Sequence, residues 1–274
     1  MSVLPALAAS LALAASAGAS PPRVVSLDFC ADQFVLALAD REQILAVSAQ
    51  ADDAHSALRA RAGGLPQLRD AAEEVLALQP DLIVRSYGGD ARTLAFYDRL
   101  GLPLHQIGFA NDFNGVRRII REAAAALEQQ ARGDALIAQM DARLAGAAAG
   151  GRPAALYLTP AGATSGSGTL MDAVLTAGGA DNAAAADGSS GWRSLPLEAL
   201  AFEAPDLVVT AFLDGDSAAK DGWALANHPV FRRLIETTPR VDLDGAHTAC
   251  GTWLLADAAA ELRAGVQALE RAAE

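Results

Sequence analysis

Residues 73–84 read EEVLALQPDLIV, and residues 198–209 read EALAFEAPDLVV. In both segments a glutamate opens a helical stretch, a Pro-Asp pair ends it, and an apolar, partly β-branched run follows. Because proline cannot continue a helix, each copy predicts a helix, a turn at the Pro-Asp pair and a buried strand. One copy of this pattern is common in α/β proteins, whereas two copies with matching offsets indicate duplicated units around a cleft.

The first third of the chain alternates between strand-like and helix-like patterns. Short β-branched runs separate stretches in which apolar residues recur at helical spacing. Strands that alternate with helices are typical of parallel sheets joined by crossover connections. We expect strands over residues 23–27, 44–47, 82–84 and 104–107, and helices over residues 28–39, 71–78 and 93–100.

The pattern changes between residues 112 and 149, where the sequence carries no strand signal. Two helical stretches meet near residues 130–133, and the second, residues 134–148, predicts a helix roughly 22 to 27 Å long. Strand signals return at residues 154–158, 207–209 and 241–243. We therefore predict a first α/β lobe over residues 20–111, a helical region over residues 112–149 that includes an interlobe helix, and a second α/β lobe over residues 150–274.

The amino-terminal residues 1–19 have the features of a signal peptide. An apolar run from Val3 to Ala15 is too short to span a bilayer comfortably and ends in small residues that suit a signal peptidase, although no basic residue precedes it. No cysteine lies at the cleavage region, so the sequence does not support a lipid anchor. We expect an exported, soluble periplasmic protein.

The charge balance of the chain bears on the partners it can have. There are 33 acidic and 21 basic residues, for a net charge of −12 at pH 7, and the basic residues do not form a cluster. Nucleic-acid-binding domains normally carry a basic patch, so we expect no nucleic-acid partner. No second apolar stretch reaches 18 residues, and the sequence therefore predicts no transmembrane helix.

Several of these segments resemble one family of transport proteins. Residues 23–27, 44–47 and 74–84 are similar to the amino-terminal lobe of the iron-siderophore and cobalamin class of periplasmic binding proteins, which serve ABC importers. Residues 166–182, with their Gly-Gly-x-x-Asn element, and residues 195–209 resemble the carboxy-terminal lobe. The resemblance implies two Rossmann-like α/β lobes with parallel sheets, joined by a single long interdomain helix, as in class III binding proteins.

The resemblance also implies what the protein does. A monomer would bind one small ligand between its lobes and deliver it to an ABC permease dimer in the inner membrane. The ligand would be a metal chelate, either a corrinoid such as cobalamin or a ferric siderophore. Haem or a free metal ion is the alternative, and no resident cofactor is expected.

Candidate ligand-binding residues follow from where the strands end. Ligands of open parallel sheets bind at the carboxyl ends of strands, and pockets favour domain interfaces. Aromatic residues are scarce in this chain, at 5%, yet five of them fall in such loops, one of them placed over the cleft by the family resemblance. An aromatic residue in a loop more often anchors that loop to the core, but five at one edge favour a flat, partly apolar ligand. These residues are Phe29, Tyr87, Trp192, Phe212 and Trp253, with Arg85 and His247 beside them; we expect Trp192 and Tyr87 to contribute most.

Other kinds of site fit the sequence less well. None of the four histidines has the His-x-x-x-His or His-Glu-x-x-His spacing of a metal enzyme, and residues 166–168 are not a nucleophile elbow, so we expect no enzyme. A zinc or manganese site needs several converging ligands, for which His55, His105 and His247 are the candidates. His105 falls within a predicted strand, however. Haem would need an axial ligand such as Tyr87 or His247.

Three glutamates are candidates for docking to the permease. In the family that the chain resembles, one surface glutamate on each lobe pairs with arginines of the permease. The repeated segment supplies Glu198 in the second lobe and Glu73 or Glu74 in the first. Each of them is also suited to an ordinary solvated position near a helix amino terminus, where the helix dipole favours a carboxylate.

The chain has two cysteines, Cys30 and Cys250. An even number of cysteines in an oxidising compartment favours a disulfide, which here would close a loop of about 220 residues and stabilise the fold by roughly 5 kcal/mol in the chain-entropy model. It would also tie the two lobes together. A free thiol that contacts the metal of the ligand, or two inert thiols, are the alternatives, because Cys30 lies near a helix amino terminus where a thiolate is favoured.

Overall fold

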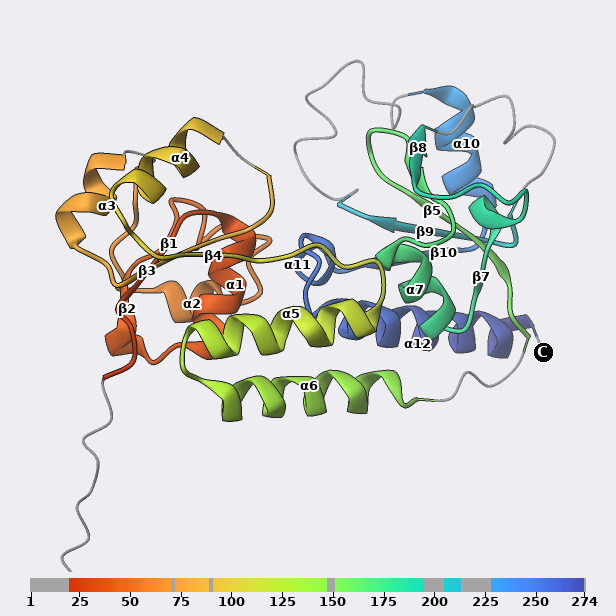
Figure 1. The fold of residues 1–274 in the computed structure, drawn as a ribbon. Coiled ribbons are helices and arrows are strands. Elements are labelled where there is room, and N and C mark those ends of the chain that lie inside the picture. Colours follow the sequence, from red (N-terminus) through yellow and green to blue (C-terminus); the bar gives the residue numbers. More distant parts are fainter. Residues whose placement is uncertain are drawn as a thin grey trace, which may run out of the picture.

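The computed structural model describes residues 20–69, 72–88, 91–146, 151–194, 205–212 and 228–273. Two α/β lobes lie side by side above a layer of long helices (Figure 1). The predicted signal peptide, residues 1–19, and Glu198 lie outside the described residues. In the part of the chain that is described, no helix is long and apolar enough to cross a membrane.

The first lobe contains a four-stranded parallel sheet in the order β2-β1-β3-β4. Helix α1 covers one face, where Val24 and Val84 are buried, and α3 and α4 cover the other, where Val25 and Ile83 are buried. The strands are β1 Val24–Ser26, β2 Ile44–Ala46, β3 Leu82–Arg85 and β4 Leu104–Gln106; the helices are α1 Phe29–Leu38, η1 Arg41–Gln43, α2 Arg59–Ala62, α3 Ala72–Leu78 and α4 Ala91–Arg99.

The second lobe repeats this plan with the parallel sheet β10-β9-β5-β7, and adds a short antiparallel pair, β6 and β8, that the sequence did not predict. Helices α7 and α12 pack on one face of the sheet and α10 on the other. The strands are β5 Ala154–Leu158, β6 Ala163–Ser165, β7 Asp181–Asn182, β8 Trp192–Ser194, β9 Leu207–Ala211 and β10 Arg240–Leu243; the helices are α7 Leu170–Ala177, η2 Ala183–Ala185, α10 Pro229–Thr237, α11 Gly245–Thr248 and α12 Leu255–Ala273.

The repeated Pro-Asp pair has the same structural role in both lobes. The Asp81 carboxylate accepts a hydrogen bond of 2.9 Å from the Arg23 backbone N–H, just before β1. The Asp206 carboxylate accepts one of 2.9 Å from the backbone N–H of Ala154, at the start of β5. Each aspartate thereby joins the start of one central strand to the start of its neighbour, so the two Pro-Asp pairs are structurally equivalent.

Two antiparallel helices, α5 Phe113–Ala126 and α6 Gln130–Leu144, lie beneath the lobes (Figure 1). The predicted break near residues 130–133 is wrong, because the turn falls at residues 127–129 and Gly133 is helical. A Cβ atom at Gly133 would lie 2.6 Å from the Cβ of Ala124, so glycine is required here for the two helices to approach, not for a break. Helix α6 then runs from the first lobe to the second.

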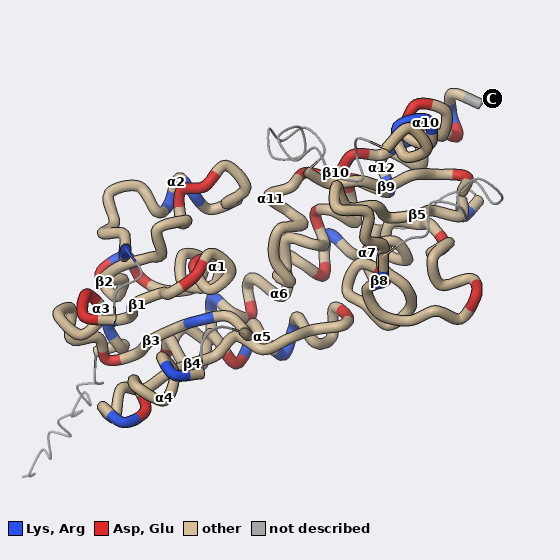
Figure 2. The backbone as a smooth tube through the Cα atoms, turned by 90° about the horizontal axis from the view of Figure 1, so that it is seen from above, with Lys and Arg blue, Asp and Glu red and all other residues tan. Residues whose placement is uncertain are grey.

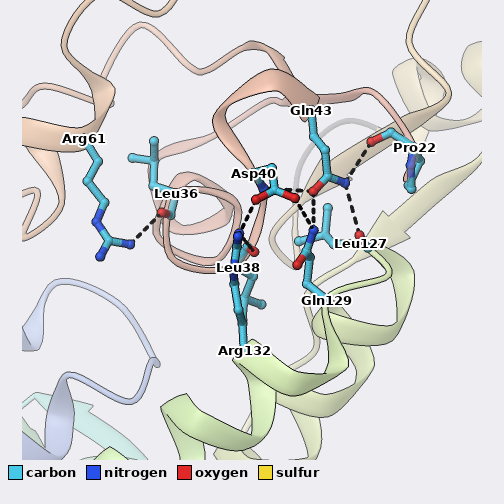
Figure 3. A network of polar contacts seen from close by, with 9 residues as sticks. All are labelled: Pro22, Leu36, Leu38, Asp40, Gln43, Arg61, Leu127, Gln129 and Arg132. Atoms are coloured by element: carbon cyan, nitrogen blue, oxygen red, sulfur yellow. Dashed lines mark hydrogen bonds and ion pairs between the residues drawn. The ribbon is translucent and has the colours of Figure 1, made fainter. Parts of the chain in front are cut away.

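The beginning of α6 is fixed to the first lobe by a polar network (Figure 3). Arg132 forms an ion pair with Asp40 and donates a hydrogen bond of 2.8 Å to the carbonyl of Leu38. Gln129 donates one of 2.6 Å to Gln43. The Arg132 guanidinium lowers the pKa of Asp40, so this pair stays charged at neutral pH.

The end of α6 is fixed to the second lobe. Arg143 forms an ion pair of 3.0 Å with Asp257 of α12, and Arg263 of α12 donates a hydrogen bond of 3.3 Å to the carbonyl of Arg143. Because one helix is held at both ends, it acts as a rigid spacer between the lobes.

Basic residues are scattered over both lobes, not gathered on one face of the described chain (Figure 2).

Candidate ligand-binding site

A cavity of about 420 Å³ lies between the lobes, at the carboxyl ends of the strands. Its volume is within the range of small-molecule sites, and its walls are mostly apolar. The first lobe contributes the loops after β3 and β4 and the start of α1. The second contributes β5, the start of α7, Trp192 and the segment between α11 and α12.

Five aromatic rings line this cavity, and four of them form two edge-to-face pairs, one pair on each lobe; the fifth is Phe34 of α1. Tyr87 and Phe109 of the first lobe have ring centroids 5.1 Å apart, and Tyr157 and Trp192 of the second have centroids 6.0 Å apart. Three of the rings are about half exposed: Tyr87 at 54%, Phe109 at 54% and Trp192 at 53%. Tyr157 is buried, and burial raises its pKa to about 12, so its phenol is neutral.

A single carboxylate positions the first-lobe side of the cavity. Asp28 caps α1 by accepting a hydrogen bond of 3.0 Å from the backbone of Ala31. Its other oxygen accepts one of 2.7 Å from the backbone N–H of Ser86, next to Tyr87. The start of α1 and the loop after β3 are therefore held together by one side chain.

An asparagine has the corresponding role in the second lobe. The side-chain amide of Asn182 donates hydrogen bonds of 2.9 Å to the carbonyl of Ser165 in β6 and to the carboxylate of Asp172 in α7. Ser165 pairs with Trp192 across the β6–β8 ladder. The Gly-Gly-x-x-Asn element thus fixes the strand from which Trp192 projects.

The predicted disulfide between Cys30 and Cys250 is present, with Cα atoms 5.6 Å apart. It joins the second residue of α1 to the segment that follows α11, and both cysteines line the cavity. The bond therefore connects the two lobes within the wall of the candidate site.

Two predicted aromatic residues make contacts between the lobes and do not line the cavity. Trp253 is buried and packs edge-to-face on Phe34 of α1, at 5.4 Å between centroids. Phe212 follows β9 with a positive φ of 65° and packs edge-to-face on His55, at 5.0 Å. Both rings therefore help to hold the lobes together.

The other three predicted ligand residues also lie outside the lining of the cavity. Phe29 is the first residue of α1. Arg85 is buried at the end of β3, where its Nε donates a hydrogen bond of 3.0 Å to the carbonyl of Ser86. His247 lies 2.5 Å from a carboxylate oxygen of Glu261, and this hydrogen bond raises its pKa.

A buried carboxyl group, Asp32, lies behind the cavity on α1. It accepts hydrogen bonds from the backbone N–H of Ser48, at 3.1 Å, and from the Ser48 hydroxyl, at 2.5 Å. Burial outweighs these contacts and raises the pKa of Asp32 to about 6. The group anchors the segment after β2, which leads to His55.

Sequence reasoning missed Phe109 and Tyr157. Phe109 follows β4 by three residues, so the rule that selected the other strand ends would have identified it too. Tyr157 lies inside β5, and no loop signal marks it.

The histidines do not form a site together. Within the described ranges, no group of three or more His, Cys, Asp or Glu side chains could hold a metal ion. His105 lies in β4, where burial lowers its pKa, and His228 caps α10.

The docking candidates of the first lobe lie at the start of α3. Glu73 is exposed, whereas the carboxylate of Glu74 accepts a hydrogen bond of 2.8 Å from the backbone of Arg69. Glu198 is not among the described residues.

Comparison with known proteins gives the family. Residues 24–234 match the sequence profile of the periplasmic binding proteins, and no curated protein sequence matches the chain. Among solved structures, the periplasmic heme-binding protein BhuT in complex with two hemes is 25% identical, with a TM-score of 0.68 over 89% of this chain and 97% of that one. The periplasmic heme-binding protein RhuT from Roseiflexus sp. RS-1 is 25% identical, with a TM-score of 0.66 over 89% and 99%.

A third structure, the periplasmic vitamin B12 binding protein BtuF of Vibrio cholerae, shares the fold at 17% identity, with a TM-score of 0.65 over 92% of this chain and 99% of that one. The sequence match covers most of the chain, and the two-lobed architecture agrees with it. The chain therefore belongs to the periplasmic binding protein family.

Proposed function

We propose that the chain is the exported substrate-binding component of an ABC importer, and that it carries a metal chelate with a flat, partly apolar ring system. The observation that supports this most directly is the pair of aromatic clusters, Tyr87 with Phe109 and Tyr157 with Trp192, that line one cavity from opposite lobes. Aromatic faces bind flat apolar groups well. A corrinoid and haem both present such a ring.

The remaining lining supports the same ligand class. Of the described residues that line the cavity, none has a side chain charged at neutral pH. A polyanionic ligand buried against these described residues would find no counter-charge among them, and burying an unpaired charge is costly. A flat chelate can instead keep its polar substituents directed to solvent. This favours a tetrapyrrole over a highly charged ferric siderophore.

Haem is the candidate that a specific side chain favours. The exposed Tyr87 lies at the cavity, where its phenol oxygen is available as an axial ligand of haem iron. His247, the other candidate ligand, is engaged by Glu261 instead. The two heme-binding proteins that are 25% identical to this chain support haem as well.

The identity of the ligand can be tested on the protein as it is exported. Protein purified from the periplasm without chelators is analysed by native mass spectrometry and by visible absorbance. We expect one bound ligand per chain, with a Soret band for haem or corrin absorption for a corrinoid. Protein that binds neither haemin nor cyanocobalamin on titration would contradict the tetrapyrrole proposal.

Delivery would require docking to a permease in the inner membrane. Glu73 in the first lobe and Glu198 in the second are the glutamates that we propose for this contact, with Glu74 beside Glu73. Glu73 is exposed, as docking requires, while Glu74 already holds the loop before α3 through Arg69. The working form is proposed to be a monomer, since one chain supplies both lobes.

A further inference from the structure

Among the described residues, a disulfide and two ring pairs join the lobes, and the disulfide and Phe34 belong to the cavity wall. The Cys30–Cys250 disulfide and the Phe34–Trp253 ring pair are successive links between the same two segments. Phe34 lies one helical turn after Cys30, and Trp253 lies three residues after Cys250. His55 and Phe212 form the third link.

The aromatic rings of the site are held separately on each lobe. Tyr87 packs on Phe109 within the first lobe, and Trp192 packs on Tyr157 within the second. Each pair therefore moves with its own lobe. The gap between the two pairs depends on how the lobes are held relative to each other, and a flat ligand fits only one width of gap.

Helix α6, the disulfide and the two ring pairs all hold the lobes relative to each other. Helix α6 is fixed to both lobes and lies beneath them (Figure 1), and none of its residues lines the cavity. The disulfide lies in the wall of the cavity itself, as do its neighbours Phe34 and Thr252. Without the bond, the two thiols must move apart to van der Waals contact, and the wall opens at that point.

We propose that the Cys30–Cys250 disulfide is a positioning element of the ligand site: it fixes the gap between the first-lobe and second-lobe aromatic pairs. This inference rests on the proposed function, because a flat ligand is what makes the width of the gap matter. The covalent bond contributes to ligand affinity by holding the lobes in place, and neither sulfur atom has to contact the ligand.

The test compares Cys30→Ser, Cys250→Ser and the double variant with the wild type, using haemin and cyanocobalamin as probes in absorbance titrations. If the released lobes keep the productive spacing about a tenth of the time, the dissociation constant rises about tenfold. All three variants should show the same rise, because each of them removes the same bond. A rise confined to one single variant would mean that this thiol touches the ligand directly, and would overturn the proposal.

Loss of stability has to be separated from loss of positioning. Phe231→Leu is the matched control, because Phe231 is fully buried in the small cluster between α10 and the sheet, away from the cavity. It should lower the melting temperature without weakening probe binding. Serine variants that lower the melting temperature and bind the probe as tightly as the wild type would contradict the inference while leaving the proposed function intact.

A second measurement needs no ligand and no variant. Dithiothreitol reduces the disulfide in the folded protein: the S–S bond breaks, each sulfur takes a proton, and the reagent becomes a cyclic disulfide. Hydrogen–deuterium exchange should then become faster in residues 248–255 and in the loops that carry Tyr87 and Phe109. Unchanged exchange there would refute the positioning role, even if neither probe binds and the proposed function is wrong.

Discussion

Replacement of Trp192 by alanine is the most direct test of the ligand site. Trp192 is 53% exposed, so about half of its surface remains for a ligand to cover. Tryptophan presents roughly 200 Å² of surface, and about 100 Å² covered at about 20–25 cal/mol per Å² corresponds to about 2 kcal/mol. The dissociation constant should therefore rise about thirtyfold.

The assay is an absorbance titration with haemin and cyanocobalamin, and it includes two controls. Trp192→Phe keeps a ring and should recover part of the affinity. Leu100→Ala removes another exposed apolar side chain, 49% exposed and outside the cavity, and should change nothing. If Trp192→Ala and Tyr87→Ala both bind the probe as the wild type does, the site is wrongly assigned.

Three further predictions follow from the fold and the docking proposal. Burial raises the pKa of Asp32 from 3.8 to about 6, so the folded protein is destabilised when this carboxyl group loses its proton. The free energy of unfolding should fall by about 3 kcal/mol as the pH rises from about 4 to above 6. Chemical denaturation at several pH values should show this loss in the wild type and not in Asp32→Asn. Asp206→Ala removes one hydrogen bond at the start of a central strand and should cost about 1 kcal/mol, lowering the melting temperature by about 2–4 °C. Asp81→Ala removes the equivalent bond and also an exposed ion pair with the Arg23 side chain, so it should cost at least as much. Unchanged melting of either variant would show that these bonds are replaced by water. Charge reversal of Glu73 together with Glu198 should abolish uptake and leave ligand affinity intact, and normal uptake would exclude the docking proposal.

The duplicated architecture could be predicted because the pattern that encodes it is local. The Pro-Asp pair precedes a buried strand and its carboxylate meets the neighbouring strand in both lobes, and in the first lobe the pair also follows the end of helix α3. The predicted disulfide followed from the number of cysteines and the compartment. Neither prediction required knowledge of which side chains meet across the fold.

Where sequence reasoning failed, a contact between two different secondary-structure elements decided the outcome. The sequence around Gly133 predicted a break between two helices. In the structure Gly133 lies inside α6, and a glycine is required there because Ala124 of α5 approaches closely. Trp253 and Phe212 lie in loops near strand ends, as predicted, yet they turn to partners on the other lobe, Phe34 and His55. The position of an aromatic residue in a loop therefore does not determine which residue its ring packs against.

The position of the disulfide in the chain has a consequence for biogenesis. The bond links residues 220 positions apart, so it encloses nearly the whole protein. In a chain that crosses the inner membrane amino terminus first, Cys30 emerges long before Cys250. The chain has two cysteines, so no wrong intramolecular pair can form; the competing reaction is pairing between two chains that are still being translocated. Overproduction should therefore trap disulfide-linked dimers, while slow synthesis gives the monomer.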